Sequence, residues 1–330
     1  MRVARAITSL AAAAGLLATA MTAALAQTYP SRTITLIVPF PAGGTTDAIA
    51  RALGDTLSQS LGQQIVIENV GGAGGSIGAT RVARTAPDGY TILLHQPGLA
   101  AAATLYPKLP FDPAKDFAGI GLINTSASII SGRASLPPNS MKELLGWAKE
   151  PGRNVTMAHA GVGAFGHLCG VLFAQEVGMK VQQVPYKGGG PALNDLVAGH
   201  ADLSCLSAAI AGELIKTGKL KGYGVVVKSR FAGLPQVETL IEAGYKNLDL
   251  QFWHALFAPA GTPRPVIERL NSALRQSFSN DRVRAIFDKN GMELYPAAEQ
   301  TPEAATALLR SEIKRWGDVI RTNNIEIQQQ

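Results

Sequence analysis

The stretch TITLIVPFPAGGTTDAIARALGDTL, residues 33–57, decides the fold of this chain. Its first part, Thr33–Val38, is a short run of β-branched and apolar residues, which is typical of an internal strand in a parallel sheet. The next six residues, Pro39–Gly44, cannot extend that strand, because the two prolines lack an N–H donor and the two glycines favour a turn. The stretch therefore predicts a buried strand, a tight glycine loop and then a helix.

The helix after this loop begins with residues that suit a helix N-terminus. Thr45 or Thr46 is predicted to be the N-cap, and the negative charge of Asp47 suits the positive end of the helix dipole. An apolar residue recurs at every fourth position and gives the helix one apolar stripe, formed by Ile49, Leu53, Leu57 and Leu61. Because backbone N–H groups are free at a helix start, we expect the loop to be an anion-binding site.

The composition of the chain excludes several classes of protein. Its 330 residues are about right for two domains. The two cysteines are too few for a disulfide-rich scaffold, and neither has the neighbouring Cys or His residues that a zinc site needs. The formal charge is +6, but the lysines and arginines are scattered. We therefore predict no nucleic-acid partner and instead an attraction for small anions.

Residues 1–26 have the features of a cleaved signal peptide. Arg2 and Arg5 form a positively charged start, residues 7–20 are apolar, and Ala24-Leu25-Ala26 matches an A-x-A cleavage site. The apolar run is short for a membrane anchor. We predict that the mature protein is exported to the periplasm as a soluble protein.

Strands and helices alternate over residues 33–94. After the opening unit, we predict a strand over Gln64–Glu68, a helix over Ser76–Ala83 that Ser76 caps, and a third strand over Tyr90–Leu94. This βαβαβ order predicts a parallel sheet with right-handed crossovers. Ligands of such sheets lie beyond the carboxyl ends of the strands, so Gln96 should lie beside the first glycine loop.

The same pattern recurs in the second half of the chain. Asn154–Ala158 and Val181–Val184 are predicted strands. A glycine loop, Ala160–Gly166, leads from the first of these strands into a predicted helix over His167–Glu176. Lys187 precedes a further glycine turn, where its side chain is either solvent-exposed or in contact with an anionic ligand. The chain therefore holds two βαβ lobes, and each has a glycine loop at a helix start.

Cys169 and Cys205 fall on the predicted helix and on a predicted strand of the second lobe. Export to an oxidising compartment would allow them to form a disulfide. Cysteine is, however, also a common small residue of protein cores. The sequence does not decide between a disulfide and two buried thiols.

The remaining segments connect the two lobes. Ile120–Ile130 is predicted to be a strand that leaves the first lobe, and the C-terminal part of the chain is expected to pack back on that lobe. The elements predicted there are the strand Phe252–Pro259, the helices Pro263–Phe278 and Pro302–Asn323, and a C-terminal strand Ile325–Ile327. The predicted domains are a signal peptide over 1–26, a first lobe over 27–125 and 229–330, and a second lobe over 126–228.

Two short motifs are shared with enzymes, and both lack the context that those enzymes need. The pattern G-x-G-x-x-G at residues 161–166 matches a dinucleotide fingerprint, but the following strand does not end in the acidic residue that holds the ribose. The pattern G-x-S-x-G at residues 74–78 matches a hydrolase nucleophile elbow, but no strand runs directly into Ser76. We predict no enzyme activity and no cofactor; an exported hydrolase built on Ser76 is the alternative.

The ordered set of segments resembles the receptors of tripartite tricarboxylate transporters, the Bug family of extracytoplasmic solute-binding proteins. The matching segments cover nearly the whole mature chain. They are Tyr29–Arg32, Ile37–Gly44 with Asp47 and Ala50-Arg51, Gly72–Gly78, Pro87–Thr91, His167-Leu168, Pro185–Gly188, Asp195-Leu196 and Ala258–Pro263. Each segment is a weak signal alone, but the ordered set is specific for the family.

The resemblance implies an α/β fold of the type II periplasmic-binding-protein (Venus flytrap) class, in which each of two lobes is a mainly parallel sheet flanked by helices. The ligand, usually a small carboxylate, lies between the lobes. In the family, the loop that matches Phe40–Thr46 holds one carboxylate and the loop that matches Gly161–His167 holds the other end. The family usually has Ser or Thr where this chain has Ala164. The missing hydroxyl favours a less polar ligand, with Phe165 as a wall.

We therefore predict that the lobes enclose a small organic anion without a metal ion. The predicted ligand-binding residues are Phe40, Ala42, Gly43, Gly44, Thr45, Thr46, Asp47, Gln96, Gly161, Gly163, Ala164, Phe165, His167, Lys187 and Asp202. The predicted function is capture of a carboxylate and its delivery to the membrane permease subunits of a tripartite tricarboxylate transporter, by a monomeric receptor. The alternative is a receptor without transport, which presents the solute to a membrane sensor. Both functions use the same cleft, so the sequence does not separate them.

Overall fold

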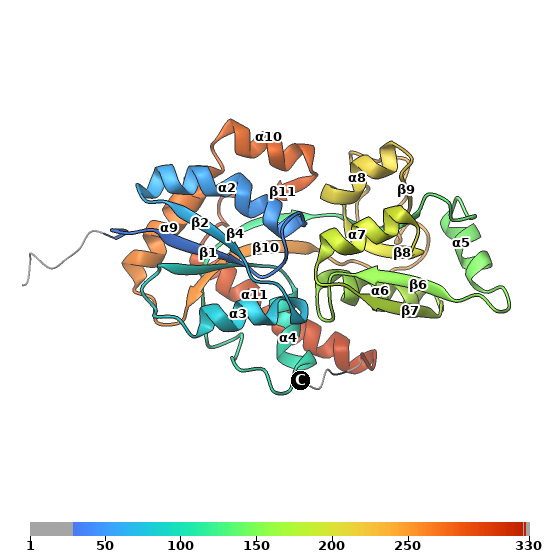
Figure 1. Cartoon of the computed structure of the whole chain (residues 1–330), viewed down its shortest axis with the longest axis horizontal. Coiled ribbons are helices and arrows are strands. Elements are labelled where there is room, and N and C mark those ends of the chain that lie inside the picture. The colour runs from blue at the N-terminus through green and yellow to red at the C-terminus, as the bar shows by residue number, and fades with distance from the viewer. Residues whose placement is uncertain (1–28, 326, 328–330) are drawn as a thin grey trace, which may run out of the picture.

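The computed structural model describes residues 29–325 and residue 327. The predicted signal peptide, residues 1–26, therefore lies outside the described residues. Within the part of the chain that is described, no helix is both long and apolar enough to cross a membrane. Two bodies lie side by side along the long axis of the molecule, and each is a sheet with helices on its faces (Figure 1). We call the body that contains the first strand lobe 1 and the other body lobe 2.

Lobe 1 is built on a six-stranded mixed sheet with the strand order β11-β4-β10-β3-β1-β2. Strand β1 pairs in parallel with both β2 and β3, as the alternation of strands and helices predicts. Strand β10 then lies antiparallel between β3 and β4. The strands are β1 (Ile34–Val38), β2 (Ile65–Asn69), β3 (Thr91–His95), β4 (Phe117–Ser126), β10 (Phe252–Pro259) and β11 (Met292–Leu294).

Helices cover both faces of this sheet. Helix α2 packs against α9 and α10 on one face, and α4 packs against α3 and α11 on the other (Figure 1). The helices are α2 (Thr45–Leu61), α3 (Ser76–Ala83), α4 (Gly98–Leu105), α9 (Arg264–Ser277), α10 (Asp281–Lys289) and α11 (Pro302–Thr322). The C-terminal helices therefore return to lobe 1.

Lobe 2 repeats the plan on a five-stranded sheet with the order β7-β6-β8-β5-β9. Strand β6 is parallel to β7 and β8, whereas β5 is antiparallel to β8 and β9. Its strands are β5 (Ser128–Arg133), β6 (Val155–His159), β7 (Val181–Pro185), β8 (Leu203–Ser207) and β9 (Leu220–Val225). Its helices are α5 (Met141–Ala148), α6 (Phe165–Glu176), α7 (Gly189–Ala198) and α8 (Ala208–Lys216).

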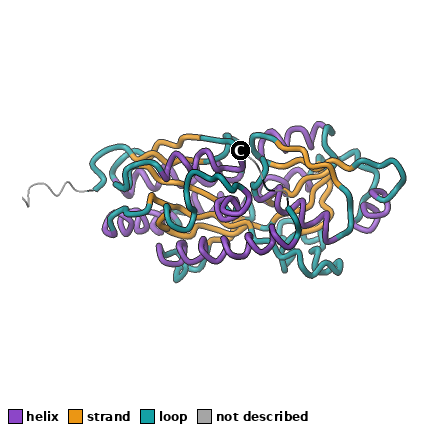
Figure 2. Tube along the Cα trace, turned by 90° about the horizontal axis from the view of Figure 1, so that it is seen from below, coloured by secondary structure: helices purple, strands orange, loops and turns teal. Residues whose placement is uncertain are grey.

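The chain crosses between the lobes twice, from β4 to β5 and from β9 to β10. The first crossing corrects the prediction of one strand over Ile120–Ile130, because β4 ends at Ser126 and β5 begins at Ser128 in the other sheet. The break falls within residues 124–128, NTSAS, a short polar stretch without the glycine or proline that would mark a strand end. Figure 2 shows the strands as two separate groups enclosed by helices.

Several other predicted elements need correction. Helices α4, α8 and α10 and strand β11 were not predicted, and α6 begins at Phe165 rather than His167. The predicted C-terminal strand is wrong at its two described residues, because neither Ile325 nor Ile327 lies in a strand. Ser76 is the first residue of α3 and makes no capping hydrogen bond, since Gly75 occupies the N-cap position.

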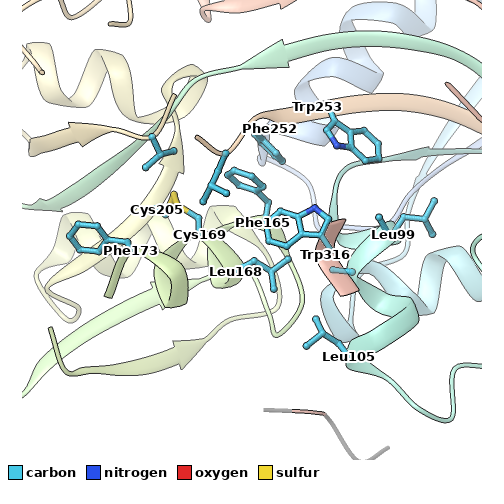
Figure 3. Packing of buried hydrophobic residues seen from close by; sticks show 14 of the residues in the cluster. Leu99, Leu105, Phe165, Leu168, Cys169, Phe173, Cys205, Phe252, Trp253 and Trp316 are labelled. Atoms are coloured by element: carbon cyan, nitrogen blue, oxygen red, sulfur yellow. A yellow bond between two sulfur atoms is a disulfide. The ribbon is translucent and has the colours of Figure 1, made fainter. Parts of the chain in front are cut away.

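One buried apolar cluster continues from lobe 1 into lobe 2. Phe252 at the start of β10 stacks on Phe165 at the start of α6, with ring centroids 4.7 Å apart. Figure 3 shows this pair between Trp253 and Trp316 on one side and the Cys169–Cys205 pair on the other. Because side chains of both lobes share this cluster, the lobes are closed against each other.

Candidate functional site

A cavity lies between the two lobes at the carboxyl ends of the parallel strands. Its volume is about 590 Å³, including the open solvent at its mouth. Lobe 1 lines it with Phe40, Gly44, Thr45, Thr46, Gln96 and Phe252. Lobe 2 lines it with His159, Ala160, Ala164, Phe165, Gly166, Gly189, Ala192, Ser204, Cys205, Leu206, Ser207 and Ile210. None of these lining residues is a lysine, an arginine or an acidic residue.

The first glycine loop is held in place by the buried carboxylate of Asp47. Its Oδ2 accepts the Gly43 N–H at 3.0 Å and the Arg51 Nε–H at 2.9 Å. Asn69 donates from Nδ2 to Asp47 Oδ1 at 3.0 Å and to the Phe40 carbonyl oxygen at 2.9 Å. Burial raises the pKa of Asp47, but the hydrogen bonds from Arg51, Gly43 and Asn69 outweigh burial and hold this pKa below its usual value. Asp47 therefore supports the loop as an anion.

The two threonines of this loop do not cap the helix, which corrects the prediction for Thr45 or Thr46. Gly44 is the N-cap of α2 and has no side chain to accept the first N–H groups. The Thr46 hydroxyl instead lies 3.2 Å from Nε2 of the buried His254. Because no side-chain cap covers them, the first N–H groups of α2 remain available at the cavity wall.

The second glycine loop is held by two histidines rather than by a carboxylate. His159 Nδ1 accepts the Gly161 N–H and His167 Nδ1 accepts the Gly163 N–H, both at 3.3 Å. The two rings pack together with centroids 4.6 Å apart. Burial lowers the pKa of His159 to about 4 and that of His167 to about 3, so both rings are neutral near pH 7.

Helix α6, which follows this loop, is joined to the sheet of lobe 2 by a disulfide. Cys169 of α6 and Cys205 of β8 are bonded, with their Cα atoms 6.1 Å apart. The sequence left this pairing undecided, and the structure decides it. Cys205 also lines the cavity, so the disulfide fixes the position of one cavity wall relative to another.

The backbones of the two lobes touch along a glycine seam, formed by Gly74 and Gly98 of lobe 1 and by Val162 and Gly163 of lobe 2. A Cβ atom at Gly74 would overlap the carbonyl oxygen of Val162, and one at Gly98 would lie 3.0 Å from the carbonyl oxygen of Gly163. Tyr106 of lobe 1 donates its hydroxyl to the Val162 carbonyl oxygen at 2.8 Å. Residues without side chains therefore permit the backbones of the two lobes to approach this closely beside the cavity.

Comparison with known proteins identifies the family. A family model described as "Tripartite tricarboxylate transporter family receptor" matches residues 49–325. The chain belongs to this receptor family. A curated relative from Agrobacterium vitis, named for the TAR-I ttuE-ttuC' intergenic region, is 40% identical over 294 residues, which cover 89% of this chain and 85% of the relative.

Solved structures of similar proteins confirm the predicted fold. MatC from Rhodopseudomonas palustris, solved with bound malate, is 35% identical to this receptor with a TM-score of 0.85, over 88% of this chain and 100% of MatC. A second R. palustris protein, solved with adipate, is 32% identical with a TM-score of 0.85, over 90% of this chain and 99% of that one. The α/β fold with two lobes, inferred from the resemblance, is therefore correct.

The structure places the predicted site residues of this receptor in three groups. Seven of them line the cavity, namely Phe40, Gly44, Thr45, Thr46, Gln96, Ala164 and Phe165. Six belong to the two loops or support them from behind, namely Ala42, Gly43, Asp47, Gly161, Gly163 and His167. The last two, Lys187 and Asp202, are not part of the cavity wall.

Lys187 and Asp202 are absent from the wall for different reasons. Lys187 is exposed to solvent. Asp202 precedes β8, at the end of that strand opposite to the cavity, where it accepts hydrogen bonds from Arg133 Nε at 3.0 Å and from the Thr156 N–H at 2.9 Å. Asp202 therefore ties the amino end of β6 to its neighbours, and its prediction as a ligand-binding residue is corrected.

Sequence reasoning missed most of the wall that lobe 2 contributes. Ser207 and Ile210 were missed because helix α8, which begins at Ala208, was not predicted. The signal was present, since Ser207 ends a buried run and serine is a preferred N-cap; in the structure it accepts the Ala209 N–H at 3.2 Å as the N-cap of α8. His159 was not among the predicted site residues, although it ends the strand that leads into the second glycine loop.

Proposed function

We propose that this protein is a periplasmic receptor that captures a small organic carboxylate between its lobes and delivers it to the permease subunits of a tripartite tricarboxylate transporter. The observation that carries the proposal is the cavity between the lobes. One helix from each lobe begins at the wall of this cavity. Helix α2 presents its first N–H groups from lobe 1, and α6 presents its own from lobe 2. Such groups bind anions through hydrogen bonds and the helix dipole.

The proposed contacts follow from which donors are free. At the lobe 1 end, the N–H groups of Thr45 and Thr46 and the Gln96 amide would hold one carboxylate. The Gln96 Oε1 accepts the Gly98 N–H at 2.9 Å, which leaves the amide hydrogens as donors. At the lobe 2 end, the N–H groups of Phe165 and Gly166 would hold the other polar end of the ligand. No wall residue carries a full charge, so selection rests on uncharged hydrogen-bond donors and on shape.

The ligand class is supported by the relatives. MatC was solved with malate and the second R. palustris protein with adipate, and both are small dicarboxylates. The wall of this receptor is more apolar at lobe 2, where Ala164, Leu206 and Ile210 lie near the Phe165–Phe252 stack. This favours an acid with an apolar body. Each carboxylate that meets a helix start gains about 0.3–2 kcal/mol.

A calorimetric titration of the purified mature protein tests the binding step. The panel contains malate, adipate, hexanoate and benzoate, with glucose as an uncharged control. We expect at least one acid to bind with 1:1 stoichiometry and to raise the melting temperature, and glucose to do neither. Absence of binding by every acid in the panel would contradict the proposal.

Uptake of the bound acid by the source bacterium tests the delivery step. Deletion of the gene should abolish high-affinity uptake, and a plasmid copy should restore it. If the protein binds the acid but deletion leaves uptake unchanged, the receptor serves a membrane sensor or another partner instead of a transporter.

A further inference from the structure

One polar atom at the cavity wall has no use in the protein itself. His159 is only 2% exposed, and its Nε2 has no hydrogen-bond partner among the described residues. Native structures leave few buried polar groups unpaired, and those that remain often await a water, an ion or a ligand. His159 lines the cavity, so the space between the lobes is the nearest place for a ligand atom that would pair with Nε2.

The other ring nitrogen determines that Nε2 is a donor. Nδ1 accepts the Gly161 N–H and therefore carries no proton. Burial keeps the ring neutral near pH 7 by lowering its pKa to about 4, so its one proton is on Nε2. A residue of the cavity wall thus carries a fixed, uncharged N–H donor, and its bond to the second glycine loop holds the ring in orientation.

The polar neighbours of His159 at the lobe 2 wall do not use this donor. Ser204 gives its hydroxyl hydrogen to the Ala158 carbonyl oxygen at 2.7 Å. Ser207 accepts the Ala209 N–H at 3.2 Å. The other side chains of this wall, among them Ala164, Leu206 and Ile210, are apolar. His159 is therefore a donor in an otherwise largely apolar recess.

We propose that His159 contacts the ligand and donates from Nε2 to an acceptor atom at the end of the ligand that enters lobe 2. The ligand is then an acid with an apolar body and a second oxygen acceptor at its far end, such as a second carboxylate, a hydroxyl or a carbonyl. This inference rests on the proposed function and makes it narrower. It predicts that the His159 side chain decides which of two acids of equal length binds more tightly.

Two acids of six carbons distinguish the contribution of the Nε2 donor to affinity from the contribution of the rest of the cavity. Adipate has a carboxylate at each end, whereas hexanoate has the same length but ends in a methyl group. The wild-type protein should bind adipate more tightly than hexanoate. In H159N the amide oxygen replaces Nδ1 as acceptor for Gly161, but the Nε2 donor is lost. Affinity for adipate should then fall about ten- to hundredfold, because a hydrogen bond to a charged group is removed.

The accompanying variants decide whether the loss has this cause. H159Q places an amide N–H near the position of Nε2 and should recover part of the affinity for adipate. Hexanoate should bind H159N and the wild type equally. H200N is the control, because His200 is exposed and does not line the cavity. We expect H200N to leave the preference for adipate unchanged.

Nitrogen NMR of the imidazole rings supplies a readout that does not depend on the ligand. The His159 signals, assigned by their loss in H159N, should show a neutral ring with the proton on Nε2 at pH 7. A proton on Nδ1, a charged ring, or equal adipate affinity of the wild type and H159N would overturn the inference. If the wild type binds neither adipate nor hexanoate, this inference fails; the proposed function fails as well only if malate and benzoate do not bind either.

Discussion

The two glycine loops occupy equivalent places in the two lobes, but different chemistry holds them. The lobe 1 loop is fixed by a carboxylate, Asp47, whose oxygens take up the Gly43 N–H and the side chains of Arg51 and Asn69. The lobe 2 loop is fixed by two neutral imidazoles, which take up the N–H groups of Gly161 and Gly163. A loop that must attract an anion can thus be supported either by a buried anion or by uncharged acceptors.

The difference has a consequence for recognition. The oxygens of Asp47 are occupied by the loop and its neighbours, so the side chain that supports the lobe 1 loop offers no further group to the ligand. An imidazole has two nitrogens, and His159 uses one of them for the loop and keeps the other free at the cavity wall. In the proposed complex, lobe 2 therefore donates hydrogen bonds to the ligand from the His159 side chain as well as from the loop backbone. Lobe 2 also has a disulfide behind its loop.

Removal of the disulfide should have the largest effect. The bond between Cys169 and Cys205 closes a chain segment with a sequence separation of 36, and loss of a crosslink of this size costs about 3–4 kcal/mol. We expect the double variant Cys169→Ala and Cys205→Ala to unfold at a correspondingly lower denaturant concentration. Urea unfolding followed by circular dichroism measures this. Equal stability of the double variant and the oxidised wild type would contradict the role given to the bond.

Asp47→Ala should have the next largest effect, because it leaves the Gly43 N–H and the Asn69 amide without a charged acceptor. We expect it to lower the free energy of unfolding by about 3 kcal/mol. Asp47→Asn is the matched control, since its amide oxygen keeps one acceptor and should recover part of the loss. Equal destabilisation by the two variants would show that the carboxylate does not support the loop through these bonds.

Gly74→Ala should weaken ligand binding by about tenfold, because the new methyl group would hold the lobes apart and reduce the fraction of closed protein. Gly62→Ala is the control, since Gly62 also has a positive φ of 71°, against 62° at Gly74, but has open space around it. The two variants should lose similar stability, and only Gly74→Ala should lose affinity in a calorimetric titration. A loss of affinity in both variants would show that the close contact at Gly74 is not what permits the lobes to close.

The smallest predicted effect concerns acid stability. A histidine whose pKa falls from about 6.5 unfolded to about 3 folded, as for His167, costs stability as the pH falls below 6.5, because the unfolded chain binds the proton first. His167→Asn should therefore reduce the stability lost between pH 7 and pH 5.5 by about 1 kcal/mol.

The pKa of Asp47 lies below its usual value, so its contribution is retained over this interval and lost only as the pH falls through its lowered pKa. Asp47→Asn should therefore show the same loss between pH 7 and pH 5.5 as the wild type. If Asp47→Asn lost less stability than His167→Asn between pH 7 and pH 5.5, the lobe 1 carboxylate and not the lobe 2 histidine would cause the acid sensitivity, which contradicts this account.

The local pattern of the sequence predicts much of this fold. A short apolar run, a glycine loop and a periodic helix identify the β1–α2 unit and its counterpart at β6–α6, and both loops lie at the cavity. Helix α4 was missed because it is alanine-rich and almost wholly buried, so it has no apolar stripe to detect. Strand β11 has three residues, too few for a period of two to be visible.

The details of the site depend on contacts between distant segments, which a single sequence does not show. A threonine beside a helix start is a good cap by local rules, yet Gly44 caps α2 and the Thr46 hydroxyl meets His254 from β10. Asp202 has the residue type of a binding group, but its place at the amino end of β8 follows from the register of β6 and β8. His159 acquires its free donor only when its ring bonds to the second loop.

The central claim is that one acid bridges the two loops, and amide NMR during a titration tests it most directly. Labelled mature protein is saturated with the acid of the panel that binds most tightly, and the backbone N–H signals of both loops are followed. The account predicts large shifts for Thr45 and Thr46 of lobe 1 together with Phe165 and Gly166 of lobe 2, at the same ligand concentration. Shifts confined to one lobe, or no shift with any acid, would contradict it.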